Sequence, residues 1–242
     1  MVKQILVLSA NPHNTVRLRV EAEARDIKNG LRQSSLRDQF EVVYEGAVRL
    51  QELRRRIVQA KPQIVHFSGH GGGEHGLVLE DDNGKAYFVQ TEQLAEMFRL
   101  FAKKNLECVI LNACYSQVQA KAINQFVPYV IGMNEAIGDR AAIQFAIAFY
   151  ETLGEGEAFD YAFEMAKAVL IGLEEEQKPV LLVNENAVKQ EQANQEAAKD
   201  NIEPFDMRQK QHEEGHVPNI TQIAGKGSKQ IGFIGHAGNI NL

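Results

Sequence analysis

Short apolar runs alternate with longer amphipathic segments over the first 184 residues of the chain, and this alternation limits the fold more than any other feature. A continuous run such as QILVLS at 4–9 is typical of a strand that is buried on both faces of a parallel sheet. The alternation predicts an α/β domain with a mostly parallel six-stranded sheet and helices on both faces. The expected strands lie at 4–9, 40–45, 62–68, 106–113, 127–133 and 179–185, and the expected helices at 16–32, 49–61, 91–103, 116–126, 139–153 and 157–173.

One segment breaks the alternation. GLVLEDDNGKAYFV at 76–89 has two short apolar runs on either side of Asp82-Asn83-Gly84, and these three residue types favour a tight turn. We therefore expect a β-hairpin that is inserted between the third strand and the helix that follows it.

Composition and charge are those of an ordinary globular protein. Of the 242 residues, 44% are hydrophobic and 24% are charged, and the formal net charge of −6 argues against a nucleic-acid-binding surface. The arginine-rich stretch at 49–61 has apolar residues at helical spacing, so its charges are interpreted as a solvated helix face. The apolar run near the N-terminus is too short to span a membrane. Two cysteines, Cys108 and Cys114, do not make a disulfide framework, so we expect a soluble, cytoplasmic protein with reduced thiols and no membrane partner.

Two predicted strands end in reactive side chains. HFSGHGGGEHG at 66–76 runs on from the third strand and presents His70, and LNACYS at 111–116 ends the fourth strand and presents Cys114. The carboxyl ends of parallel strands form one edge of a sheet, so both side chains can reach one crevice if the strands are neighbours. A thiolate nucleophile needs a base or a cation beside it, and an imidazole serves both purposes. The main-chain N–H groups of Gly71 and Cys114 are the candidate donors for the oxyanion of an acyl-transfer reaction.

The residues around this pair resemble those of a known family. PQIVHFSGHG at 62–71 and CVILNACYS at 108–116 resemble the caspase-like peptidases, most closely the bacterial CHAT group. Caspases place the histidine about 50 residues before the cysteine, and here the separation is 114 − 70 = 44 residues. Further similar stretches, which extend the resemblance over about residues 3–184, are ILVLSANP, RLRVEAE, GLVLEDDNG, YVIGMNEAIGDRAAIQFAIAFYETLGEG and KPVLLV.

The resemblance implies a caspase-like sandwich fold and a cysteine endopeptidase that acts on protein or peptide substrates. It implies a Cys114–His70 dyad without a required third side chain, with a backbone carbonyl able to orient His70 instead. It further implies an effector of bacterial defence or cell-death signalling, and the alternative is an inactive caspase-like module that binds partners. Asn112 and Tyr115 depart from the animal caspase pattern around the cysteine, so aspartate specificity is not predicted.

Asp139 and His75 are further candidates for a substrate pocket. Asp139 follows the fifth strand and opens a predicted helix, so it either caps that helix or lines or supports the pocket for the residue before the cut. The resemblance implies the second role, because related caspase-like peptidases often use an acid there to select Arg or Lys. His75 lies on the glycine-rich loop, where it either touches substrate or faces solvent.

Other kinds of site are weaker interpretations of the same residues. A zinc site built from His66, His70, His75 and Cys114 would have a spacing that fits no tetrahedral zinc motif. GHGGG lacks the lysine and the Ser/Thr of a phosphate-binding loop. We therefore predict no metal and no cofactor. His66 is interpreted as a histidine that is satisfied in the core or supports the site, and Cys108 as a core residue.

The composition changes after residue 185. Residues 186–218 are polar and charged with few apolar anchors, and we interpret them as a helical or disordered tether. Residues 219–242 contain no proline and are rich in glycine, β-branched residues and Asn/Gln, and KQIGFIG at 229–235 resembles the RHIM-like amyloid signalling motifs. The prediction is a peptidase domain at 1–185, a linker at 186–218, and a motif at 219–242 that recruits an upstream receptor or self-assembles. The alternatives for the motif are a strand that pairs with a sheet edge and a disordered end.

Overall fold

The structure, a computed structural model, describes residues 2–200. Its main sheet has six strands in the order β2-β1-β3-β6-β7-β8, and all neighbours are parallel except β8, which runs antiparallel to β7. This confirms the predicted sheet. Its strands are β1 (Lys3–Ser9), β2 (Phe40–Glu45), β3 (Ile64–Ser68), β6 (Cys108–Asn112), β7 (Tyr129–Met133) and β8 (Pro179–Val183).

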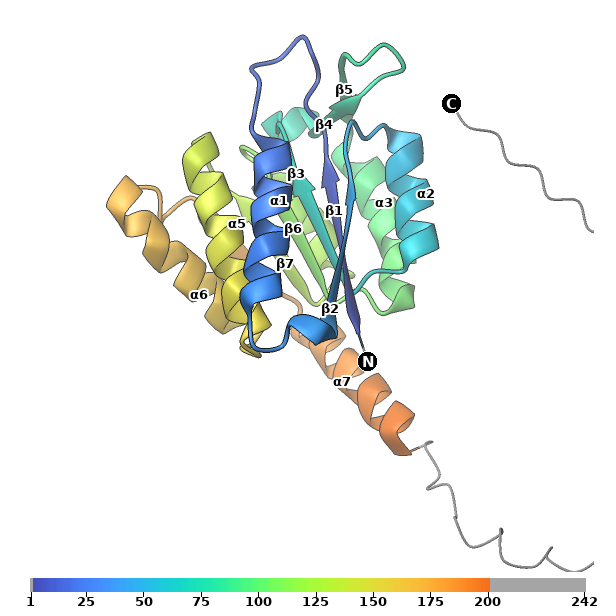
Figure 1. The fold of residues 1–242 in the computed structure, drawn as a ribbon. Helices are drawn as coiled ribbons and strands as arrows, with labels where there is room; N and C mark the ends of the chain where they lie inside the picture. The colour runs from blue at the N-terminus through green and yellow to red at the C-terminus, as the bar shows by residue number, and fades with distance from the viewer. Residues whose placement is uncertain (1, 201–242) are drawn as a thin grey trace, which may run out of the picture. The chain divides into compact units, whose positions relative to one another are not determined.

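Helices cover both faces of this sheet, as predicted (Figure 1). Helices α1, α5 and α6 lie on one face, where α5 contacts both α1 and α6. Helices α2, α3 and α4 lie on the other face. A further helix, α7, follows β8. The helices are α1 (Val20–Gln33), α2 (Leu50–Ala60), α3 (Thr91–Phe101), α4 (Gln117–Asn124), α5 (Asp139–Gly154), α6 (Phe159–Leu170) and α7 (Glu185–Asp200).

Alternate residues of each central strand build two separate cores. In β1, Ile5 and Val7 belong to the core beneath α1 and α5, whereas Leu6 and Leu8 belong to the core beneath α2 and α3. The division follows from the alternation of side chains along a strand. Because both faces of the strand are buried, the sequence of the strand is a continuous apolar run.

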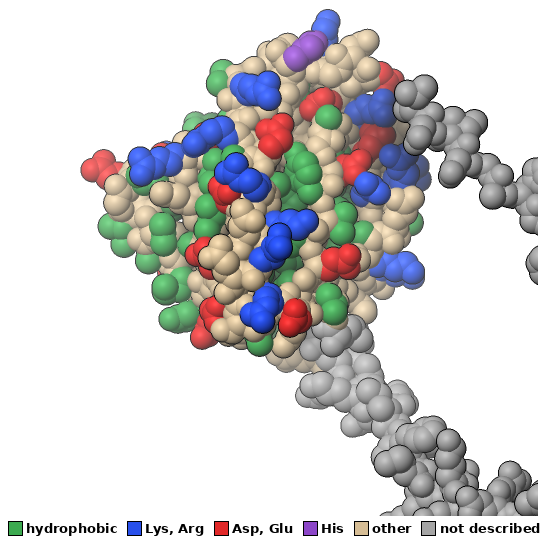
Figure 2. Space-filling view, viewed as in Figure 1, with side chains coloured by type: hydrophobic (Ala, Val, Ile, Leu, Met, Phe, Trp, Pro, Cys, Tyr) green, Lys and Arg blue, Asp and Glu red, His purple; other side chains and the backbone are tan. Residues whose placement is uncertain are grey.

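The surface is mixed in charge. Figure 2 shows Lys and Arg side chains interspersed with Asp and Glu over the face that carries α1. Apolar side chains on α6, namely Tyr161, Met165 and Val169, are also exposed. None of the helices within residues 2–200 combines the length and the apolar character that a membrane crossing requires.

The start of the first predicted helix is wrong. α1 begins at Val20, not at residue 16, and residues 10–19 form a loop that we call the strap. Asn11 closes the strap, because its side-chain N–H donates to the carbonyl of Leu18 at 2.9 Å and its side-chain oxygen accepts from the Leu18 N–H at 3.1 Å. The first of these bonds occupies a carbonyl that would accept an intrahelical bond in a longer helix, and Val16, which fits the helical period, is 79% exposed.

The predicted hairpin is present and it holds the strap. Its strands β4 (Leu77–Glu80) and β5 (Ala86–Val89) pair antiparallel. The N–H of His13 in the strap donates to the carbonyl of Gly84 at 3.0 Å, and the N–H of Ala86 donates to the side-chain oxygen of Asn14 at 2.8 Å. The insertion thus supports a loop that is far from it in the sequence.

The described residues include only the beginning of the predicted tether. α7 occupies that part. The rest of the tether and the motif at 219–242 lie outside the described residues, so the predicted division at 185 and 218 stays a prediction.

Candidate active site

The two reactive side chains line the same pocket. β3 and β6 are neighbours, and Ser68 at the end of β3 is the register partner of Asn112 at the end of β6. His70 and Cys114 each lie two residues beyond these strand ends, and both line one narrow pocket of about 40 Å³. The residues that share its lining include Leu18 of the strap, Glu23 of α1, Ile137 and Asp139.

The imidazole of His70 is oriented by the strap. Its Nε2 lies 2.7 Å from the carbonyl oxygen of Val16. A carbonyl oxygen only accepts, so Nε2 carries a hydrogen, and in the neutral ring Nδ1 is then the free lone pair. A main-chain carbonyl therefore orients the ring, as the sequence resemblance implied, and the strap supplies it.

Cys114 lies at a sharp turn of the chain. Its Sγ is partly buried and lies 3.6 Å from the carbonyl oxygen of Ile137. The next residue, Tyr115, has a left-handed backbone with φ of 55°, which is uncommon for a residue with a side chain. Backbone strain of this kind is found at functional sites.

Gly71 is packed directly against the main chain of Cys114. A Cβ atom at Gly71 would lie 1.9 Å from the carbonyl oxygen of Cys114, so no other residue fits there without a shift of the backbone. Within the described residues, neither the N–H of Gly71 nor that of Cys114 donates a hydrogen bond. Two free main-chain donors thus belong to residues whose backbones are in contact.

Asp139 lines the same pocket but does not cap α5. The N-cap is Gly138, and Asp139 is the first helical residue, so the capping interpretation is wrong. The carboxylate instead accepts from Arg19 twice, from its N–H at 3.0 Å and from its Nε at 2.6 Å. This ion pair ties the end of the strap to α5.

His75 is not brought to this pocket. It is exposed on a short 3₁₀ turn (Gly73–His75), and its ring packs edge-on against Phe88 with centroids 6.2 Å apart. It lines a separate, open hollow together with Glu74 and Gln90.

A buried polar cluster under the pocket was missed in the sequence. Glu23 is 3% exposed, and its carboxyl group contacts His66, Ser68 and Asn112 at 2.8, 2.5 and 2.7 Å. The other ring nitrogen of His66 lies 3.3 Å from the hydroxyl of Tyr150. Both nitrogens of this buried ring thus have partners, which agrees with the interpretation of His66 as a satisfied core histidine. The available signal was the position of Glu23, which falls on the apolar face of α1 between Val20 and Ile27.

Within the part of the chain that the structure describes, the remaining cysteine and histidines form no metal cluster. Cys108 is fully buried, as predicted, and burial raises the pKa of its thiol far above the ordinary value. Among residues 2–200, no group of three or more His, Cys, Asp or Glu side chains is arranged to hold a metal ion.

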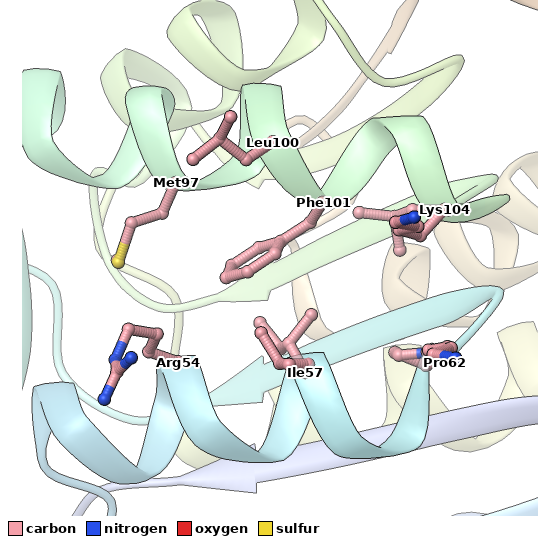
Figure 3. A pocket seen from close by; sticks show the side chains of 10 residues that line it. Arg54, Ile57, Pro62, Met97, Leu100, Phe101 and Lys104 are labelled. Atoms are coloured by element: carbon pink, nitrogen blue, oxygen red, sulfur yellow. The ribbon is translucent and has the colours of Figure 1, made fainter.

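A larger apolar pocket of about 310 Å³ lies elsewhere, between α2 and α3 (Figure 3). Ile57 and Phe101 form part of its wall, and Arg54 and Lys104 lie on its rim. Its lining includes Pro62 and Leu106, which come just before β3 and β6. The pocket therefore lies near the amino ends of these strands, whereas Cys114 follows the carboxyl end of β6. Neither Cys114 nor His70 lines it, so the candidate thiol chemistry belongs to the smaller pocket.

The small pocket thus combines a thiol and an imidazole from the loops that follow two neighbouring parallel strands of an α/β sheet. The family model for the CHAT domain matches residues 4–213, and the chain belongs to the CHAT domain family.

Two relatives have names that refer to proteases. The chain is 28% identical over 163 residues to a "Probable protease" of Gillisia limnaea, a match that covers 67% of this chain and 29% of that protein. It is 24% identical over 174 residues to a "Roc-COR-CHAT protease" of an unknown prokaryotic organism, covering 69% of this chain and 16% of that protein. The chain therefore spans less than a third of the length of either relative.

A solved structure has the same fold. The secreted C11 cysteine protease of Bacteroides thetaiotaomicron, crystallised with an irreversible peptide inhibitor, superposes with a TM-score of 0.54 at 12% identity. The match covers 71% of this chain and 60% of that one. At this identity the likeness concerns the fold alone.

Proposed function

We propose that this chain is a cysteine endopeptidase in which Cys114 is the nucleophile and His70 is the general base and acid. The observation that carries the proposal is that both side chains line one pocket. In addition, the hydrogen bond to the carbonyl of Val16 leaves Nδ1 of His70 free to accept a proton. Family membership and the protease names of the relatives support a peptidase of this kind.

The reaction follows from these groups. Nδ1 of His70 takes the proton of the Cys114 thiol, and the sulfur attacks the carbonyl carbon of the scissile peptide bond. The carbonyl oxygen becomes an oxyanion, which accepts hydrogen bonds from the N–H groups of Gly71 and Cys114. The imidazolium then returns its proton to the leaving amine as the C–N bond breaks. Water, deprotonated by His70, hydrolyses the resulting thioester and restores the thiol.

The carbonyl of Val16 keeps the imidazole productive throughout this cycle. It accepts from Nε2–H whether the ring is neutral or protonated. The ring therefore cannot flip and present Nε2 instead of Nδ1 to the sulfur.

The pocket is suited to a basic residue before the cut. Asp139 contributes a carboxylate, which now pairs with the exposed guanidinium of Arg19. Asn112 also lines the pocket, and its side-chain oxygen is buried with no hydrogen-bond partner in the described part of the chain. An Arg or Lys side chain of a substrate would pair with the accessible carboxylate of Asp139 in place of Arg19.

The proposed biological role is that of an effector in bacterial defence or cell-death signalling. In this role the motif at 219–242 would recruit the peptidase to an upstream receptor or assemble copies of it, which raises their effective concentration. The support for this role is the sequence resemblance alone, because the motif lies outside the described residues.

The peptidase assignment is tested with Cys114→Ala. Purified wild-type and variant proteins are assayed on fluorogenic peptides that end in Arg, Lys, Asp or Leu, and new protein N-termini are mapped in cells that express each. We expect cleavage after Arg or Lys by the wild type and none by Cys114→Ala, because no other thiol lines the pocket.

Cys108→Ala is the matched control for this test. It removes the buried thiol, so it lowers the melting temperature but leaves cleavage near the wild-type rate. Identical N-termini in wild type and Cys114→Ala, with no peptide cleaved by either, would reject the peptidase and favour the inactive binding module.

A further inference from the structure

Glu23 is a carboxyl group at a place where an α/β core usually has an apolar side chain. It extends from the buried face of α1 toward the carboxyl ends of β3 and β6 and is 3% exposed. Burying an acid is costly unless donors surround it. Here Oε2 accepts from the hydroxyl of Ser68, and Oε1 accepts from the amide of Asn112 and lies 2.8 Å from Nε2 of His66.

The two strand-end partners of Glu23 are equivalent in position. Ser68 and Asn112 face each other in the parallel register of β3 and β6. Each stands two residues before a member of the proposed dyad, Ser68 before His70 and Asn112 before Cys114. The N–H of Gly69 also donates to the carbonyl of Asn112 at 3.3 Å, so the two strands are still joined where they leave the sheet. One carboxyl group thus fixes the last residue of both strands.

His66 completes the arrangement from below. It lies in β3 between Glu23 and Tyr150, and both of its ring nitrogens have partners. The cluster therefore joins α1, β3, β6 and α5 through side chains that are all buried.

We propose that Glu23 is a positioning residue of the proposed peptidase, one that sets the separation of the Cys114 sulfur and the His70 ring by clamping Ser68 and Asn112. The proposal rests on the proposed function. In this role Glu23 does not touch the reacting atoms. It acts on them through the two-residue segments that lead from Ser68 to His70 and from Asn112 to Cys114. A displacement of about 1 Å at a catalytic group costs up to about a hundredfold in rate.

The test measures the reactivity of Cys114 rather than peptide cleavage alone. Wild type, Glu23→Gln and His70→Ala are alkylated with iodoacetamide across a pH series, and modification of Cys114 is followed by mass spectrometry of its peptide. Cys108 does not interfere, because burial keeps its thiol protonated and inaccessible. Besides the thiol of Cys114, the ionisable groups that line the pocket are Glu23, His70 and Asp139, and Asp139 is paired with Arg19.

The direction of the shift separates positioning from simple charge. If Glu23 acted only as a nearby negative charge, its removal would lower the pH midpoint for alkylation of Cys114. If Glu23 holds the imidazole beside the thiol, Glu23→Gln raises the midpoint toward that of His70→Ala, near the ordinary thiol value of about 8.5. We expect the rise, and with it a fall in kcat of about tenfold to a hundredfold with a smaller change in KM.

A reciprocal pair of variants controls for folding. Asn112→Asp alone places two carboxyl groups together, and Glu23→Gln alone places two amides together, whereas the double variant restores one of each. We expect the double variant to recover part of the lost rate and of the pH midpoint. Ser68→Ala, which removes one small donor, should give a weaker shift in the same direction and covers the case in which Glu23→Gln does not fold.

The outcomes distinguish this proposal from the peptidase assignment. An unchanged or lowered midpoint in Glu23→Gln, with the wild type alkylated faster than His70→Ala, overturns the positioning role and leaves the dyad intact. Equal alkylation of wild type and His70→Ala at every pH overturns the dyad, and the positioning role falls with it.

Discussion

At the scale of single residues, the site depends on two that contribute little or no side-chain chemistry. Gly71 brings its main chain against that of Cys114, and Val16 orients His70 through a carbonyl. His70, Cys114 and Gly71 could be predicted because two strand ends that can share one crevice carry them, in stretches that resemble the CHAT group. It could not predict Val16, since any residue supplies a carbonyl. Glu23 left a fainter signal, an acid on the apolar face of a helix.

Gly71→Ala is expected to remove nearly all activity. The added Cβ would meet the carbonyl oxygen of Cys114 at 1.9 Å, which displaces one of the two proposed oxyanion donors and costs about a hundredfold or more in kcat. The measurement is kcat on the best fluorogenic peptide, together with the melting temperature. Gly172→Ala is the matched control, because a Cβ there meets nothing within 4 Å. Equal kcat for the two alanine variants would show that the close approach has no bearing on the reaction.

At the scale of elements, the strap and the hairpin act together. The hairpin was predicted from its turn residues, whereas residues 16–19 of the strap were predicted as the first turn of a helix because Val16 fits the helical period. Periodicity reports which residues a helix could bury, but here bonds from Asn11 compete with the helix for the backbone of Leu18. The competition is tertiary in origin, since the hairpin and Asp139 hold the strap from outside.

Asn11→Ala is expected to lower activity more than stability. It removes both bonds to Leu18, worth about 1–3 kcal/mol together, and frees the carbonyl of Val16 from its fixed place. We expect kcat to fall about tenfold while the protein stays folded with a melting temperature a few degrees lower, because Ala10 is the one strap residue that belongs to either core. Arg17→Ala is the control, as this exposed strap residue makes neither bond. An Asn11→Ala variant as active as Arg17→Ala would contradict the orienting role of the strap.

At the scale of the whole molecule, the order of strands explains where the candidate site lies. β3 and β6 are the two central strands, so their carboxyl ends meet above the middle of the sheet with a core on each face. Apolar runs predicted the strands well because every central strand is buried on both faces of the sheet. Their order in the sheet was not predicted in detail, since pairing between distant strands leaves no periodic trace in the sequence. The segment after residue 200 remains a prediction from composition.

The assembly of residues 219–242 can be tested without the enzyme. A synthetic peptide of this sequence is expected to bind thioflavin and sediment, since it has no proline, is rich in β-formers and Asn/Gln, and has only Lys226 and Lys229 as clear charges. A peptide with Ile231→Asp and Ile234→Asp is the control and should stay in solution, because like charges would stack along the fibril. A wild-type peptide that remains soluble and unstructured at high concentration would reject the assembly role.

The hold on His70 comes from the outside of the protein. Val16 is 79% exposed although its carbonyl bonds to the ring, so the residue that orients His70 is accessible to a binding molecule from solvent. A molecule that binds the strap and displaces the Val16 carbonyl could therefore inhibit the proposed reaction without entering the pocket. Antibody fragments or peptides selected against residues 10–19 are accordingly a direct route to agents that silence the protein.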